Sequence, residues 1–179
     1  MRTKQTIAVI GATDKMGSAI AKSLSVGNYR LLLYAKDLNT CKQLAAEILS
    51  KHLLADAEAM DCSMHASWEA DMIIIAAPDS EYKEISVKIR EVATQKIVIS
   101  MADPLLETYN GTITAPENTA PEDLQQLLPH SKVVKAVIDN KRAEVFIAGN
   151  DQDAVEMARE MMSVAGYHPI LAKNLFIQL

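Results

Sequence analysis

The sequence TIAVIGATDKMGSAIAKSL at residues 6–24 combines a strand, a turn and a helix in close succession. Residues 7–10 are a short apolar run bounded by polar residues, which predicts a fully buried strand. Gly11 ends the run, Gly17 follows, and apolar side chains recur at helical spacing at Met16, Ile20 and Leu24. Strand, glycine turn and helix in this order are the setting of a dinucleotide-binding fingerprint.

The turn at residues 11–17 predicts a site for a pyrophosphate. A helix N-terminus carries unpaired amide groups and the positive end of the helix dipole, and both attract an anion. The loop departs from the usual G-x-G-x-x-G pattern, because one extra residue separates its first and closing glycines. We expect the whole loop to contact the cofactor: Gly11, Ala12, Thr13, Asp14, Lys15, Met16 and Gly17. Alternatively, the glycines serve only to make a tight turn between strand and helix.

Asp14 stands where the usual pattern has its middle glycine, which lets the backbone approach the phosphates. Its carboxylate would have the same sign of charge as the ligand. At an effective dielectric constant near 20, two unit charges about 5 Å apart repel each other by about 3 kcal/mol. We therefore expect Asp14 to point outward or to cap the helix; otherwise the loop does not hold a pyrophosphate in the ordinary way.

Composition excludes several classes of function. The 179 residues suit one domain with a sizeable core, and the net charge of -5 gives no basic footprint for nucleic acid or an anionic membrane. No apolar run approaches about 18 residues, so no membrane partner is expected. Cys41 and Cys62 form no C-x-x-C pair, which favours free thiols and a cytoplasmic location. The four histidines lack metal-ligand spacing, and no metal site is predicted.

The end of the second predicted strand, residues 29–35, distinguishes NAD from NADP in dinucleotide-binding folds. An acid there hydrogen-bonds the ribose hydroxyl groups, whereas a basic residue accepts the 2′-phosphate. Both Lys36 and Asp37 follow this strand. Lys36, together with Arg30, favours NADP, with NAD as the alternative. If the end of the strand binds no cofactor, Lys36 is a solvated lysine, and Asp37 or Asn39 caps the next helix.

Strands and helices alternate along the rest of the chain. Helices are expected at residues 39–52, 80–92, 122–128 and 151–165, with a short helix or turn at 62–68. Strands are expected at residues 57–60, 71–78, 97–100, 132–137, 143–148 and 168–171. This alternation predicts an α/β fold, a doubly wound and mostly parallel sheet of the NAD(P)-binding Rossmann-like kind. A single domain is expected, in which residues from about 130 to 179 complete the sheet.

Residues 101–121 interrupt the alternation with several prolines and an Asn-Gly pair. A loop of this length is seldom idle, and it follows the carboxyl end of a sheet strand, where ligands bind. Asp103, which opens the loop, is therefore the candidate contact to a substrate. The histidines lie in contexts typical of structural residues, so the catalytic residue is left unassigned.

Together these segments resemble the NADP oxidoreductases that use the deazaflavin coenzyme F-420, a family related to the N-terminal domains of pyrroline-carboxylate reductases. The resemblance spans nearly the whole chain. It lies in the order and spacing of IGATDKMG (10–17), ADMIIIAAP (70–78), KIVIS (96–100), KVVKA (132–136), VFIAGND (145–151) and AGYHP (165–169). It implies a single-domain and commonly dimeric reductase that passes hydride between NADP(H) and a second ring at the switch point of the sheet.

The resemblance also implies roles for individual residues. Thr13 and Met16 would lie in the phosphate loop, and Lys36 would face the 2′-phosphate of NADP. Ala77 and Pro78 would lie against the nicotinamide end of the cofactor.

The chain departs from the family pattern at three places. The family has glycine at the position of Asp14, and a serine and two basic residues at positions 35–37, here Ala-Lys-Asp. It has Phe-Asn-Thr at positions 137–139, which are Val-Ile-Asp here.

Hydride transfer needs few side chains, because the cofactor supplies the chemistry while the protein orients two rings and excludes water. The sequence therefore predicts an NADP(H)-dependent oxidoreductase that acts on a small-molecule substrate, with a deazaflavin or flavin as the candidate co-substrate and a homodimer as the expected assembly. The carboxylate of Asp14 favours an alternative, a catalytically silent dinucleotide-binding module that serves as a sensor or partner subunit.

Overall fold

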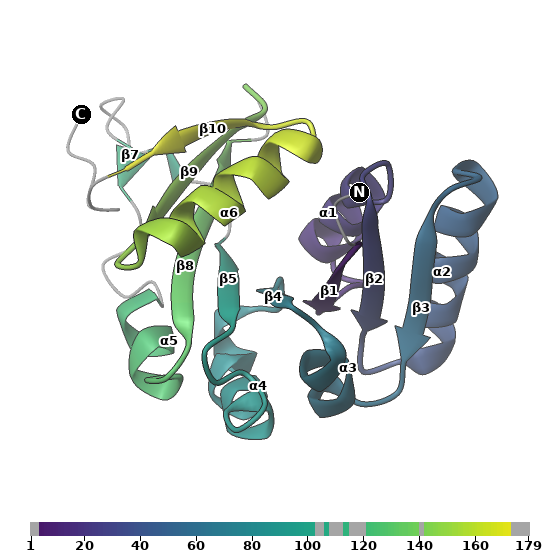
Figure 1. Ribbon diagram of the computed structural model, residues 1–179, viewed down its shortest axis with the longest axis horizontal. Coiled ribbons are helices and arrows are strands. Elements are labelled where there is room, and N and C mark those ends of the chain that lie inside the picture. Colours follow the sequence, from purple (N-terminus) through teal and green to yellow (C-terminus); the bar gives the residue numbers. More distant parts are fainter. Residues whose placement is uncertain (1–3, 103–105, 108–112, 115–120, 140–141, 173–179) are drawn as a thin grey trace.

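A computed structural model describes residues 4–102, 106–107, 113–114, 121–139 and 142–172 (Figure 1). The strands are β1 (Gln5–Ile10), β2 (Tyr29–Tyr34), β3 (Asp56–Met60), β4 (Met72–Ile75), β5 (Ile97–Ala102), β6 (Leu106–Glu107), β7 (Ile113–Thr114), β8 (Lys132–Asp139), β9 (Glu144–Gly149) and β10 (His168–Leu171). The helices are α1 (Lys15–Leu24), α2 (Leu38–Lys51), α3 (Ser63–Glu69), the 3₁₀ helix η1 (Asp79–Glu81), α4 (Tyr82–Ile89), α5 (Pro121–Leu127) and α6 (Gln152–Val164).

One eight-stranded sheet runs through the molecule in the order β10-β9-β8-β5-β4-β1-β2-β3. Six neighbouring strands of this sheet are parallel, namely β3, β2, β1, β4, β5 and β8. Strand β9 is antiparallel to β8, and β10 is parallel to β9. The order of the strands reverses direction between β1 and β4, and ligands of open α/β sheets bind in the crevice at such a switch point. The predicted α/β Rossmann-like fold is confirmed.

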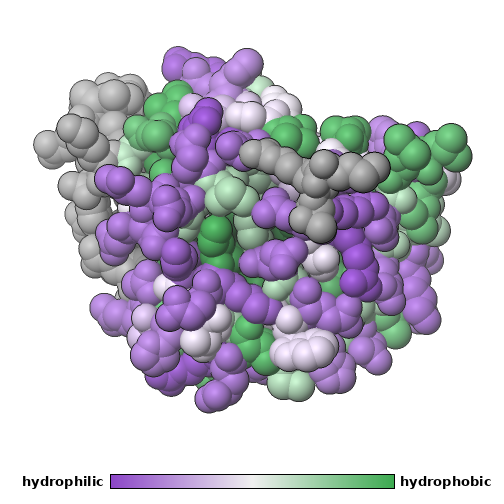
Figure 2. Space-filling view, viewed as in Figure 1, coloured by the Kyte–Doolittle hydropathy of each residue, from purple (hydrophilic) through white to green (hydrophobic). Residues whose placement is uncertain are grey.

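The sheet is covered on both faces, which explains why β4 is apolar at every position and β1 is apolar at its last four positions. In β1, Ile7 and Val9 belong to the core cluster that includes residues of α1, α2 and α6, whereas Ala8 and Ile10 belong to the cluster that includes residues of α3, α4 and α5. All four residues of β4 are buried. The outer surface is mostly hydrophilic in Figure 2, and exposed leucines gather where α2 ends, at Leu49, Leu53 and Leu54.

Several boundaries differ from the expected ones. The strand expected at residues 71–78 ends at Ile75, because the chain leaves the sheet after the amide of Ala76 donates to the Ile10 carbonyl at 2.8 Å. The helix expected at residues 80–92 is divided into η1 and the shorter α4. Strand β5 continues to Ala102, and the small antiparallel pair β6 and β7 lies within the expected loop at residues 101–121. Asp103 lies outside the described residues.

The edge and terminal elements agree with the sequence interpretation. Asp151 caps α6 by accepting a hydrogen bond from the amide of Ala154 at 2.9 Å, and Gly166 ends that helix with a φ of 88°. The predicted strand at residues 168–171 pairs with β9 at the edge of the sheet. Among the described residues, none of the helices has both the length and the apolar character needed to cross a membrane.

The turn between β1 and α1 depends on two close backbone contacts. A Cβ atom added at Gly17 would lie 2.0 Å from the carbonyl oxygen of Gly11, so α1 can approach the turn only with glycine at this position. Gly11 has a φ of 83°, and a Cβ atom there would lie 2.8 Å from the backbone nitrogen of Ala77. Both glycines therefore have a structural role, whatever the loop binds.

Gly17→Ala should destabilise the protein by about 3 kcal/mol, since the new methyl group meets backbone atoms that cannot move aside. At an ordinary helix position the same change would stabilise by about 1 kcal/mol. Thermal or urea unfolding measures the difference, with Ser18→Ala on the same helix as the control. An unchanged or higher free energy of unfolding would contradict the contact.

Candidate functional site

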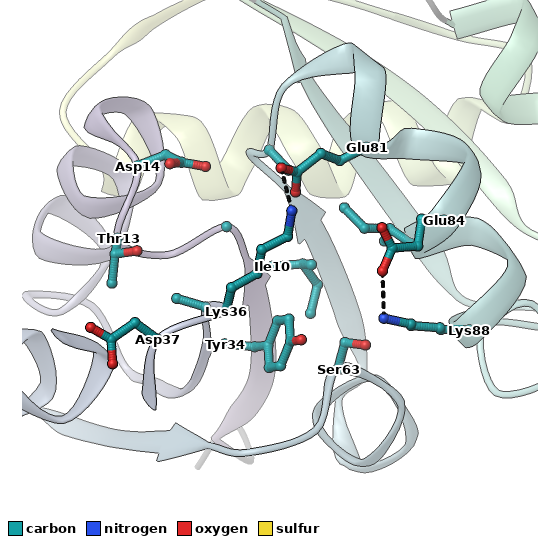
Figure 3. A pocket seen from close by; sticks show the side chains of 14 residues that line it. Ile10, Thr13, Asp14, Tyr34, Lys36, Asp37, Ser63, Glu81, Glu84 and Lys88 are labelled. Atoms are coloured by element: carbon teal, nitrogen blue, oxygen red, sulfur yellow. Dashed lines mark hydrogen bonds and ion pairs between the residues drawn. The ribbon is translucent and has the colours of Figure 1, made fainter. Parts of the chain in front are cut away.

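A pocket of about 240 Å³ lies at the carboxyl ends of β1, β2 and β4, at the switch point of the sheet (Figure 3). Its walls come from the loop at residues 11–17, the end of β2 and the segment that follows β4. The lining residues are Ile10, Gly11, Thr13, Asp14, Tyr34, Ala35, Lys36, Asp37, Ser63, Ala77, Glu81, Glu84, Ile85 and Lys88.

The loop between β1 and α1 turns tightly, and the backbone amides in the first turn of α1 are available as hydrogen-bond donors. The amides of Gly11 and Ala12 donate to the Tyr34 carbonyl at 3.0 and 2.9 Å, and the Asp14 amide donates to the Gly11 carbonyl at 3.1 Å. The first intrahelical bond of α1 runs from the Ser18 amide to the Asp14 carbonyl at 2.8 Å. The preceding amides of the first turn have no such partner in the helix and are the groups that bind anions at helix N-termini.

The predicted loop residues divide into two groups. Gly11, Thr13 and Asp14 line the pocket. The others do not: Ala12 is fully buried, Lys15 is exposed outside the pocket, and Met16 packs against the hydrophobic core. Gly17 is also buried, and the side chains of Ala12 and Met16 pack inward, so any contact of these three residues to a ligand passes through their backbone.

Asp14 does not cap α1. It occupies the N-cap position, with φ of −66° and ψ of 158°, yet its side chain accepts no capping hydrogen bond. Its carboxyl group is turned toward Glu81 across the pocket (Figure 3). Partial burial, followed by the negative charge of Glu81, raises the pKa of Asp14, while Lys36 opposes this shift. Of the two orientations expected for Asp14, capping of the helix is wrong; the residue is exposed and lines the pocket.

Lys36 spans the pocket and forms an ion pair with Glu81, with 2.6 Å between Nζ and Oε1 (Figure 3). This hydrogen bond raises the pKa of Lys36. The Lys36 side chain is 66% exposed, so this lysine is both solvated and paired with Glu81. Asp37 is the helix cap, because it accepts hydrogen bonds from the Asn39 amide at 2.9 Å and the Thr40 hydroxyl at 2.6 Å.

Glu81 was not among the residues that the sequence indicated. It lies in η1, 45 residues from Lys36, and faces β2 only because β1, β2 and β4 end at the same edge of the sheet. Glu84 and Lys88 also line the pocket and pair with each other on α4 at 2.7 Å. Ala77 lines the pocket, whereas Pro78 does not.

The pocket combines an apolar floor with a charged mouth. Ile10 and Ile85 are both buried and approach from the sheet and from α4. Carboxylates outnumber ammonium groups among the lining side chains, and Asp14 and Glu81 lie on opposite sides of the opening. Such a pocket can accept a flat apolar ring, while an anion must approach along the first turn of α1 and Lys36.

The fold and the pocket at its switch point define the class, an oxidoreductase fold that binds NAD(P). Residues 6–104 match the family model of the NADP oxidoreductases described as coenzyme F420-dependent. The match covers more than half of the chain, and the chain belongs to this family.

Solved structures with the same fold include a candidate F420-dependent NADP-reductase from Arthrobacter sp. FB24. It is 22% identical, with a TM-score of 0.71 over 96% of this chain and 86% of that one. The pyrroline-5-carboxylate reductase from Coxiella burnetii is 16% identical, with a TM-score of 0.74 over 97% of this chain and 60% of its own. The pyrroline carboxylate reductase from Plasmodium falciparum, solved with NADP bound, is 14% identical, with a TM-score of 0.67 over 97% of this chain and 59% of its own. A search of curated proteins gave no significant match.

The Asp14 carboxyl group should titrate above the ordinary value for aspartate, and Glu81→Gln should lower its pKa. The substitution removes a like charge and leaves Lys36 in place, and both effects favour the ionised form. NMR titration of side-chain carboxyl carbons measures this pKa. Glu84→Gln is the control, because Glu84 is not among the groups that shift Asp14. An Asp14 pKa that stays the same in Glu81→Gln would refute the electrostatic contact.

Proposed function

We propose that this protein is an NADP(H)-dependent oxidoreductase that transfers hydride between the nicotinamide and a second small or flavin-like acceptor. The observation that carries the proposal is the pocket itself, which joins Asp14, the N-cap residue of α1, to Lys36 after β2 in a chain of this family. One end of the pocket suits a diphosphate, and the other suits a 2′-phosphate.

Each part of the pocket has a role under this proposal. The first-turn amides and the dipole of α1 hold the diphosphate, with Gly11 and Thr13 beside it. Ile10 and Ile85 provide an apolar surface for the adenine ring, and Lys36 pairs with the 2′-phosphate. All the loop residues predicted from the sequence remain proposed cofactor contacts, through side chain or backbone.

The end of β4 positions the reacting ring. The cofactor supplies the hydride, so this chain has to orient the ring and keep water away. Ala77 is buried, and its backbone lies against Gly11, which fixes this segment beside the phosphate loop. Ala77 and Pro78 are therefore proposed to contact the nicotinamide end. Asp103 remains the proposed contact to the substrate, and a deazaflavin or flavin remains the proposed co-substrate.

Two further features are proposals. A homodimer follows from the family resemblance, and a cytoplasmic location follows from the free thiols of Cys41 and Cys62.

NADPH should bind the purified protein and lose its hydride to a deazaflavin, a flavin or a small carbonyl compound. Lys36→Gln should weaken NADPH binding about tenfold and NADH binding less than threefold, because only NADPH carries the 2′-phosphate. Titration calorimetry and the loss of NADPH absorbance measure binding and turnover. Lys88→Gln, which changes a lysine of the same pocket that pairs with Glu84, is the matched control.

Two results would contradict the proposal. Binding of neither dinucleotide would remove the cofactor assignment. Binding of NADPH without oxidation by any of these acceptors would favour the dinucleotide-binding module without catalysis.

Asp14→Asn should tighten NADH binding about fivefold near neutral pH, because the ionised carboxylate repels the diphosphate across a partly solvated gap. In the wild-type protein the affinity for NADH should fall as pH rises through the raised pKa of Asp14. NADH is used because it has no 2′-phosphate that titrates in this range. Asp14→Gly, which restores the glycine of the family pattern, should behave similarly.

Calorimetric titrations across acidic to neutral pH provide the test. The Asp14→Asn profile should be flatter than the wild-type profile. Weaker binding by the Asn variant would mean that the carboxylate contacts the ligand favourably and that the repulsion argument is wrong.

A further inference from the structure

The ion pair between Lys36 and Glu81 lies where cofactor discrimination takes place in this fold. Lys36 follows β2, the strand whose end contacts the adenosine ribose in dinucleotide-binding sheets. Glu81 reaches this point from η1 on the opposite wall, with its Oε1 atom 2.6 Å from the Lys36 ammonium. The two side chains therefore meet across the opening of the pocket (Figure 3).

A carboxylate at this point has opposite consequences for the two cofactors. NAD presents ribose hydroxyl groups, which donate hydrogen bonds that a carboxylate accepts. NADP presents a 2′-phosphate instead. When this phosphate is fully ionised it has no proton to donate to a carboxylate, and the two negative charges repel each other. The same carboxylate also occupies the ammonium group that the phosphate needs as its partner.

We propose that Glu81 is a specificity-determining residue that lowers the affinity for NADP(H) relative to NAD(H). It does so by pairing with Lys36 and by placing a negative charge where the 2′-phosphate would bind. This inference rests on the proposed function, because it concerns the same cofactor site. Under this proposal, the carboxylate that accepts hydrogen bonds from the ribose belongs to the segment after β4 and not to the end of β2.

Burial and charge around the pair support this role. The Glu81 side chain is 30% exposed and the Lys36 side chain is 66% exposed, so the lysine can leave the pair and follow an incoming phosphate. Glu81 is the less exposed partner, and it lines the pocket. Asp14 lies on the other side of the opening and adds a second negative charge on the path of a phosphate.

The neighbouring acid of α4 provides a matched comparison. Glu84 lines the same pocket and also pairs with a lysine, but its partner is Lys88 on the same helix, at 2.7 Å. Removing the Glu84 charge therefore leaves the Lys36–Glu81 hydrogen bond in place and removes only a charge interaction with Lys36 that is weaker than that of Glu81. A general effect of pocket charge would act through either glutamate, whereas a specific effect acts only through Glu81.

Titration calorimetry with NADPH and with NADH on the wild-type chain, Glu81→Gln and Glu84→Gln tests the proposal. Glu81→Gln should raise the ratio of NADPH affinity to NADH affinity about tenfold, since it frees Lys36 and removes the repulsion. Glu84→Gln should change this ratio less than threefold. Thermal unfolding of both variants checks that the fold is kept, and a loss of fold alone would not shift the ratio between two ligands.

The outcomes separate this inference from the proposed function. If the wild-type protein binds a dinucleotide and the ratio is the same in Glu81→Gln, or shifts equally in Glu84→Gln, the specificity role is overturned while the cofactor site stands. If none of the three proteins binds either dinucleotide, both proposals fail. If only Glu81→Gln binds NADPH, Glu81 discriminates as proposed, and the wild-type chain is not an NADP(H) enzyme.

Discussion

The close approach of α1 to the turn that precedes it determines the geometry of the rest of the site. With the Gly17 position in contact with the Gly11 carbonyl, and Gly11 in contact with the backbone of Ala77, the starts of α1 and of the segment after β4 are locked together. These contacts join β1 and β4, the two strands between which the sheet order reverses. Backbone contacts thus place the first-turn amides and the proposed nicotinamide end relative to one another.

The fold was predictable because its main signals are local. Continuous apolar runs mark β1 and β4 as strands buried on both faces, and Asp37 and Asp151 start their helices with capping bonds that span two or three residues. The errors occur where a boundary depends on distant partners. Strand β4 ends where its hydrogen bonds to β1 end, and the last of these is donated by the Ala76 amide. The residues that follow are also apolar, so the sequence does not indicate this boundary.

The site was predictable only in part, for the same physical reason. The loop at residues 11–17 and the position of Lys36 follow from the order of strand, turn and helix along the chain. Glu81 and the orientation of Asp14 do not, because they depend on which side chains the parallel strands bring to one edge of the sheet. A sequence pattern identifies the end of β2, whereas the charged residue that faces it, Glu81, lies in the segment that follows another strand, β4.

In this pocket the backbone contacts therefore determine stability, whereas the charged side chains act on the ligand. Gly11 and Gly17 are in contact with backbone, so changes there act on the free energy of unfolding. The Lys36–Glu81 pair and Asp14 border the solvent, where a charge contributes little to stability but acts directly on an anionic ligand. Under the proposed function, these carboxylates would oppose the attraction of the helix N-terminus for a diphosphate. Because exposed charges contribute little to stability, substitutions of these carboxylates should leave the sheet unchanged, and under the proposed function they would alter the affinity for the cofactor and the choice between NAD and NADP.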